Sequence, residues 1–130
     1  MEKKLLLEIN DLEVVYKTDQ ETVQAVNGLN FTLNERETLG IVGETGAGKT
    51  TTALSILRLL PERTGKILNG SIRYHGADLL DLPVQDMRKI RGNKIAMIFQ
   101  DPMTSLNPIM TVGHQIGEAI LLHNENTTKE

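Results

Sequence analysis

The chain has 130 residues, the length of a single domain. Hydrophobic residues make up 39% and charged residues 24% of the sequence, which is typical of a folded globular protein rather than a disordered segment. The formal net charge is −3 and aromatic residues make up only 3%, so neither charge nor base-stacking side chains favour nucleic-acid binding. The absence of cysteine excludes a disulfide scaffold and a cysteine-ligated metal within this stretch, and it favours a cytosolic location.

No stretch of the sequence has the features of a signal peptide or the length of a membrane span. The longest apolar runs, such as residues 95–99, are far shorter than the roughly 20 residues that a spanning helix needs. Any attachment to a membrane is therefore expected to depend on a partner.

The N-terminal third of the chain alternates apolar and polar residues. The alternation covers residues 5–9 and, after a polar stretch at residues 17–22, residues 29–33. A period of two is typical of strands with one buried face, so the sequence predicts antiparallel strands joined by a loop.

From Leu39 onward the pattern indicates a parallel α/β core. Residues 39–42 and 95–99 are short apolar runs, which are typical of strands buried on both faces. Between them a helix is predicted over residues 50–60, because apolar residues recur at the spacing of one helix face until Pro61 ends the pattern. Those apolar residues are Ala53, Ile56, Leu57 and Leu60. The order strand, helix, strand predicts a parallel sheet.

Shorter elements are predicted around this core. They are a strand at residues 71–74, followed by a turn at His75 and Gly76, a helix at residues 84–91 and a helix at residues 112–122. An irregular loop is expected between Pro102 and Pro108.

The strongest motif of the chain is a glycine-rich loop. Its residues match G-x-x-x-x-G-K-[ST] in full and are Gly43, Glu44, Thr45, Gly46, Ala47, Gly48, Lys49 and Thr50. Glycines let successive backbone N–H groups point toward a phosphate, and the positive end of the following helix favours the same anion. We expect Lys49 to contact the β- and γ-phosphates and the Thr50 hydroxyl to bind Mg²⁺. The predicted strand before the loop and helix after it make an incidental glycine-rich turn the less favoured interpretation.

Gln100 directly follows the second apolar run, at the strand end where α/β sheets bind ligands. Its amide oxygen is suited to bind Mg²⁺ or to orient an attacking water. In the alternative interpretation the run is a Walker B strand and Asp101 is the acid that acts on the metal. Spacing alone leaves both open, together with a simple solvated glutamine.

Tyr16 is an isolated aromatic residue at the end of a predicted strand. Its ring is suited to stack on a nucleotide base, and ordinary packing at a sheet edge is the alternative. On the evidence of Tyr16 alone, packing is the favoured interpretation.

Several segments together resemble ABC-transporter ATPases. They are the glycine-rich loop, the helix ending Arg58-Leu59-Leu60-Pro61, and Phe-Gln-Asp-Pro-Met-Thr-Ser-Leu-Asn-Pro at residues 99–108. Within this family the sequence is similar to the importers of dipeptides, oligopeptides and nickel, also through Arg-Lys-Ile-Arg-Gly at residues 88–92. The resemblance covers nearly the whole chain, and it favours Gln100 over Asp101.

The resemblance implies ATP and Mg²⁺ as cofactors and a role for each matching residue. Tyr16 corresponds to the family's adenine-stacking aromatic residue, residues 43–50 to its Walker A loop, and Thr51 to a position close to the α-phosphate. Gln100 corresponds to the Q-loop glutamine, which contacts Mg²⁺ and senses the γ-phosphate. Gln100 and Lys49 are the residues expected to act in catalysis.

The implied fold is the α/β core of a P-loop NTPase with an N-terminal antiparallel β-subdomain. On this basis residues 1–36 form the antiparallel subdomain and residues 37–102 the phosphate-loop core. Residues 103–130 contain the rest of the Q-loop segment and the start of a helical subdomain.

The implied function is that of an ATP-binding and, in the full-length subunit, ATP-hydrolysing component that energises import of peptides or nickel. The implied partners are a second ATPase subunit in a head-to-tail dimer, two transmembrane permease subunits and an extracytoplasmic solute-binding protein, with no nucleic acid. The implied location is the cytoplasmic face of the membrane, where residues 101–112 would face the permeases.

The family's Leu-Ser-Gly-Gly-Gln signature, its Walker B Asp-Glu pair and its switch histidine do not occur among the 130 residues. His75, His114 and His123 stand in other contexts and are expected to be solvated or structural. The sequence is therefore expected to be the N-terminal portion of a longer subunit and to be inactive in hydrolysis by itself. Two alternatives are a truncated nucleotide-binding remnant without turnover and an independent P-loop kinase that uses Asp101.

Overall fold

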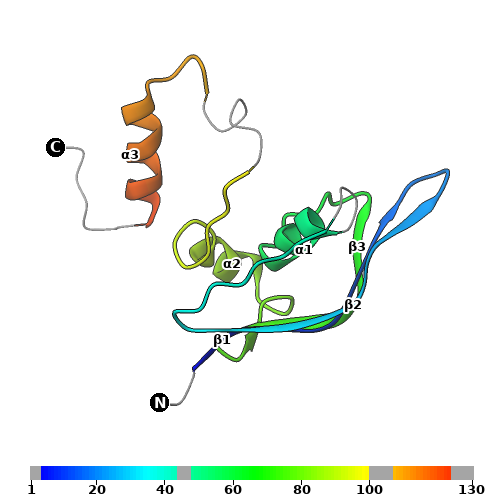
Figure 1. The fold of residues 1–130 in the computed structure, drawn as a ribbon. Helices are drawn as coiled ribbons and strands as arrows, with labels where there is room; N and C mark the ends of the chain where they lie inside the picture. Colours follow the sequence, from blue (N-terminus) through cyan, green and yellow to red (C-terminus); the bar gives the residue numbers. More distant parts are fainter. Residues whose placement is uncertain (1–3, 44–47, 100–106, 124–130) are drawn as a thin grey trace. The chain divides into compact units, whose positions relative to one another are not determined.

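The computed structural model describes residues 4–43, 48–99 and 107–123 (Figure 1). The chain consists of two compact units, Met1–Pro83 and Val84–Glu130. The predicted residues Glu44, Thr45, Gly46, Ala47, Gln100 and Asp101 lie outside the described residues.

The first unit is built on a four-stranded antiparallel sheet with the order β2-β1-β3-β4. The strands are β1 (Leu5–Lys17), β2 (Thr22–Asn34), β3 (Gly65–Tyr74) and β4 (Ala77–Asp78). The predicted antiparallel pair near the N-terminus is confirmed as β1 and β2. The strand predicted at residues 71–74 is also present, but it begins earlier, at Gly65.

A bulge interrupts the central strand β1 on both of its sides. Ile9 faces Phe31 whereas Leu12 already faces Leu29, so β1 carries one more residue than β2 there, and the register with β3 shifts at the same place. Asp11 has a left-handed backbone with φ of 46°. The Asn30 side chain compensates for the broken ladder, because its Oδ1 accepts the Asp11 N–H at 2.9 Å.

The core of this unit lies where the sheet meets the only helix of residues 1–83 that the structure describes. Ile9, Leu12 and Val14 of β1 and Ile72 of β3 are almost completely buried. Leu57, at the end of helix α1 (Lys49–Ile56), is buried as well, and α1 lies over one face of the sheet (Figure 1). Burying such side chains contributes roughly 1.5–3 kcal/mol each.

Helix α1 ends four residues before the predicted end at Leu60. The Arg58 N–H donates to the Ser55 carbonyl at 3.1 Å and the Leu59 N–H to the Leu54 carbonyl at 2.8 Å, the pair of bonds that defines a Schellman motif. Arg58 takes the left-handed position, with φ of 56°. Its guanidinium Nη1 donates to the Leu82 carbonyl at 2.5 Å, which helps to hold this ending.

The buried face of α1 also differs from the predicted one. Thr51, Thr52, Ser55 and Leu57 are buried, whereas three of the predicted apolar residues, Ala53, Ile56 and Leu60, are only half-buried. The hydroxyls explain how polar residues can be buried here: Thr52 donates to the Gly48 carbonyl and Ser55 to the Thr51 carbonyl. Each buried hydroxyl thereby keeps a hydrogen-bond partner.

The predicted buried strands at residues 39–42 and 95–99 are not formed in the described parts of the chain. Val42 is 93% exposed and Ile98 is 97% exposed. Ile95 forms an isolated parallel bridge with Arg91, but neither run belongs to a strand. A strand exists only when its backbone groups pair with neighbours, and no described residue supplies a ladder for these runs.

The second unit contains two described helices, α2 (Val84–Ile90) and α3 (Val112–His123). Both helices predicted in this region are confirmed to within one residue at each end. Met87 of α2 is buried, whereas none of the residues of α3 is. Among the described residues, no helix is long and apolar enough to cross a membrane.

Candidate nucleotide-binding site

Gly48 stands between the glycine-rich loop and α1, in a conformation that only glycine adopts easily. It is the N-cap of the helix, with φ of 86° and ψ of 9° in the left-handed region. A Cβ atom at this position would lie 2.4 Å from the carbonyl oxygen of Ala25 in β2. The motif glycine is therefore required twice, by its backbone angles and by the close approach of a neighbouring strand.

Lys49, the first residue of α1, connects the two ends of the glycine-rich loop. Its Nζ donates a hydrogen bond to the Gly43 carbonyl, and both residues are exposed. The structure thus places the ammonium group of Lys49 beside the backbone of Gly43, the first residue of the motif. An incoming anion can reach it there without uncovering a buried charge.

Thr50 and Thr51 occupy the first turn of α1 in different environments. Thr50 is exposed, so its hydroxyl is accessible to a ligand or a metal ion. Thr51 is only 8% exposed, and its Oγ1 lies 2.9 Å from the Tyr16 hydroxyl. The first turn carries no acidic side chain that would repel an anion.

Tyr16 reaches this site from the end of β1, 35 residues away in the sequence. Its half-buried ring and its bond to Thr51 join the end of the central strand to the first turn of the helix. The spatial relation between Tyr16 and Thr51 is thus established by the fold, whereas sequence spacing gave no indication of it.

The described residues fit a nucleotide phosphate with Mg²⁺. A helix N-terminus supplies unpaired N–H groups, Lys49 supplies a cation, and Thr50 supplies an accessible hydroxyl, with Gly48 held in a position that a Cβ would fill. An ammonium group is suited to bind phosphate, and a hydroxyl oxygen is suited to bind a magnesium ion.

The three histidines have ordinary surroundings. His75 lies in the β3–β4 turn with its ring 4.5 Å from that of Tyr74, and His114 pairs with Glu118 one helical turn away, at 3.5 Å. His123 lies near Gly92. No group of three or more His, Cys, Asp or Glu residues in the described segments is arranged to hold a metal ion.

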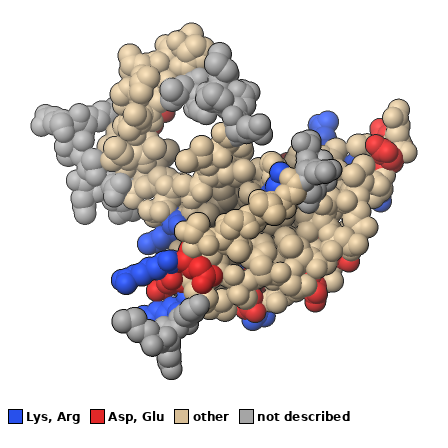
Figure 2. Space-filling view, in the orientation of Figure 1, with Lys and Arg blue, Asp and Glu red and all other residues tan. Residues whose placement is uncertain are grey.

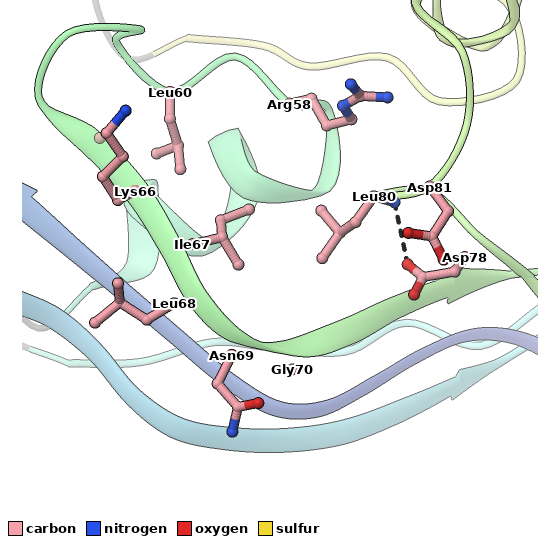
Figure 3. A pocket seen from close by; sticks show the side chains of 11 residues that line it. Arg58, Leu60, Lys66, Ile67, Leu68, Asn69, Gly70, Asp78, Leu80 and Asp81 are labelled. Atoms are coloured by element: carbon pink, nitrogen blue, oxygen red, sulfur yellow. Dashed lines mark hydrogen bonds between the residues drawn. The ribbon is translucent and has the colours of Figure 1, made fainter.

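A concave region lies at the C-terminal end of α1 (Figure 3). It has a volume of about 570 Å³ and is lined by Arg58 and Leu60, by residues 65–70 of β3, and by Asp78, Leu80 and Asp81. Asp78 in this region is already engaged, because its Oδ1 accepts the Leu80 N–H at 3.0 Å. None of the residues predicted for nucleotide binding that the structure describes lines this pocket.

On the face shown in Figure 2, the charged residues that the structure describes do not gather in a field of one sign. Figure 2 shows basic and acidic side chains interspersed around the described parts of the face in view. Neither sign dominates that face, which agrees with the small net charge of −3.

Comparison with known proteins assigns the chain to a family. The family model described as "ABC transporter" matches residues 26–130, which include the glycine-rich loop and all of α1, α2 and α3. The chain therefore belongs to the ABC transporter family, and this membership favours a transporter ATPase over an independent kinase that uses Asp101.

Individual relatives narrow the comparison. The chain is 51% identical over 126 residues to the "Probable peptide ABC transporter ATP-binding protein y4tR" of Sinorhizobium fredii, covering 97% of this chain and 38% of the relative. It is 50% identical over 119 residues to the "Oligopeptide transport ATP-binding protein OppD" of Salmonella typhimurium, covering 92% and 35%. It is 45% identical over 125 residues to the "Oligopeptide transport ATP-binding protein AppD" of Bacillus subtilis, covering 96% and 38%. The chain thus spans little more than a third of the length of these relatives.

Proposed function

We propose that this chain forms the phosphate-binding part of the ATP-binding subunit of an ABC importer for peptides. The observation that carries the proposal is the left-handed Gly48 at the start of α1 together with the contact of Lys49 with the Gly43 carbonyl. The relatives at about 50% identity, which are named as peptide or oligopeptide transport ATP-binding proteins, give the class of transporter. The family that the sequence resembles also includes importers of nickel, but the names of the relatives favour peptides as the transported substrate.

In this proposal the described residues divide the work of holding ATP. Backbone N–H groups of the loop and of the first turn of α1 bind phosphate oxygens, and Lys49 exchanges the Gly43 carbonyl for the β- and γ-phosphates. The Thr50 hydroxyl would hold Mg²⁺, and the bound ion would neutralise part of the phosphate charge. Thr51 lies near the α-phosphate, and the ring of Tyr16 stacks on the adenine.

The remaining predicted residues complete the proposal. Glu44, Thr45, Gly46 and Ala47 extend the phosphate cradle, and Gln100 contacts Mg²⁺ and senses the γ-phosphate. The segment after Gln100 faces the permeases at the cytoplasmic side of the membrane. A second ATPase subunit, two permeases and a solute-binding protein then complete an importer.

The proposed fold of the complete site is a P-loop core, with boundaries at residues 1–36, 37–102 and 103–130. Two apolar runs support it, one exposed throughout at residues 39–42 and one exposed in part at residues 95–99. Ile41 is 48% and Phe99 51% exposed, an unfavourable state for such residues unless another part of a longer subunit covers them. We propose that both runs become strands of a parallel sheet in such a subunit.

Peptide uptake tests this proposal. In cells that depend on the complete importer, Lys49→Ala is expected to reduce peptide uptake at least about tenfold, because a charge-assisted bond to phosphate contributes roughly 1.5–3 kcal/mol. Lys89→Ala, at an exposed position of α2, is the matched control and should leave uptake unchanged. Equal uptake by wild type and Lys49→Ala, at equal protein levels, would refute the proposed function.

A further inference from the structure

Gln115 in the first turns of α3 makes four contacts with backbone groups that precede the helix. Its Oε1 accepts the Asn107 N–H at 2.7 Å. Its Nε2 lies 3.0 Å from the Asn107 carbonyl, 3.1 Å from that of Met110 and 3.3 Å from that of Thr111. The amide oxygen of Gln115 faces one backbone N–H, and its amide nitrogen faces three backbone carbonyls, so the orientation of the amide is fixed. One of the two N–H groups of the amide is shared between two carbonyls.

Both backbone groups of Asn107 are thereby paired with one side chain, much as a neighbouring strand would pair them. The turn has further support from within, because the Asn107 Oδ1 accepts the Ile109 N–H and the Thr111 Oγ1 accepts the His114 N–H. Residues 107–111 therefore form a turn that Gln115 fastens to the start of α3.

Apolar burial does not explain why this turn is held so closely. No residue of α3 is buried, and Ile109 before the helix is 89% exposed. Ile116 and Ile120, four residues apart on one face of the helix, are 55% and 46% exposed. The hydrogen bonds of Gln115 thus define the shape of a surface that has apolar residues available for a partner.

We propose that Gln115 is a positioning residue that gives the 107–111 turn the shape in which it contacts a permease subunit, so that ATP turnover is coupled to transport. The inference rests on the proposed function, and it adds a role for a residue that none of the sequence motifs includes. Asn107 stands seven residues after Gln100, the proposed γ-phosphate sensor, in the sequence.

Two substitutions separate the parts of this proposal. Gln115→Met keeps the length of the side chain and removes all four polar contacts. Gln115→Glu keeps the acceptor for the Asn107 N–H and removes the donors to the three carbonyls. Gln85→Met is the matched control, because Gln85 is an exposed glutamine of α2.

The first readout is hydrogen exchange at the Asn107 amide in the purified full-length subunit. Gln115→Met is expected to accelerate exchange about fivefold or more, whereas Gln115→Glu retains the acceptor and leaves exchange close to that of the wild type. Unchanged exchange in Gln115→Met would overturn the proposed contact.

The second readout is the amount of peptide transported per ATP hydrolysed by the assembled importer in vesicles. Gln115→Met and Gln115→Glu are expected to lower this ratio about fivefold, with ATP affinity within about twofold of wild type and Gln85→Met unchanged. An unchanged ratio would refute the positioning role, and so would a loss of ATP affinity, since Gln115 would then act on the fold as a whole. Because Lys49→Ala is assayed in parallel, a failure of the proposed function is recognised separately by its unchanged uptake.

Discussion

Gly48 shows how a single residue supports the start of α1 at the proposed phosphate site. Its left-handed backbone and the Ala25 carbonyl beside it leave no room for a side chain, so α1 can begin at Lys49 only if glycine precedes it. The sequence motif predicts a glycine here from the needs of a phosphate, whereas the structure adds a second need, which is close packing against β2.

Substitution of this glycine is expected to destabilise the protein. Gly48→Ala combines a left-handed alanine with a backbone contact of 2.4 Å, and we expect a loss of about 2–4 kcal/mol in the free energy of unfolding, measured by urea denaturation. Gly28→Ala is the matched control, because Gly28 also has a positive φ, 67°, but nothing lies within 4 Å of the added Cβ. It should cost only about 1 kcal/mol. Equal losses in the two variants would show that the Ala25 contact has no effect.

At the scale of secondary-structure elements, the bulge of β1 is held by a side chain rather than by the ladder. Asn30 accepts the Asp11 N–H at 2.9 Å and donates to the Gly28 carbonyl at 3.1 Å. These bonds replace backbone pairs that the extra residue removes from the sheet. The bulge bends the central strand, whose last residues include Tyr16.

Removing this side chain is expected to weaken the sheet. Asn30→Ala should lower the free energy of unfolding by about 1 kcal/mol, because the exposed bonds at Asp11 are replaced in part by water. Asn27→Ala, an exposed position of the same strand, serves as control and should change stability by less than about 0.5 kcal/mol. A thermal or urea unfolding series measures both. A larger loss for Asn27→Ala would contradict the role assigned to Asn30.

The helices and antiparallel strands were predictable from local pattern because their signals are short-range. Alternation revealed β1 and β2, and the helix signals at α2 and α3 gave ends correct to within one residue. The end of α1 was missed, since Arg58 closes the helix in a conformation that glycine usually takes, with help from distant carbonyls of residues 79–82. Such contacts leave no trace in local periodicity.

At the scale of the whole molecule, the apolar runs at residues 39–42 and 95–99 show what a local sequence pattern cannot predict. Their composition predicts buried strands, but strands require neighbours, and the described residues provide none. The contact of Tyr16 with Thr51 was also beyond local pattern, because it joins residues 35 positions apart that the fold brings together. The contacts of Gln115 are local, but they depend on the shape of the turn at residues 107–111 and not on a periodic pattern. The glycine-rich motif could be identified from the sequence because its residues are consecutive, and its role in phosphate binding remains a proposal.

We propose that the motif between Gly43 and Thr50, with Lys49 as its cation, binds the phosphates of ATP. Equilibrium titration of ATP with Mg²⁺ into the purified protein tests it directly, with Lys49→Ala and the control Lys89→Ala measured alongside. We predict saturable binding by wild type and Lys89→Ala, and an affinity at least about tenfold weaker in Lys49→Ala. Equal affinity in all three proteins, or no binding by the wild type, would contradict the proposed binding of ATP phosphates by Lys49 and the loop.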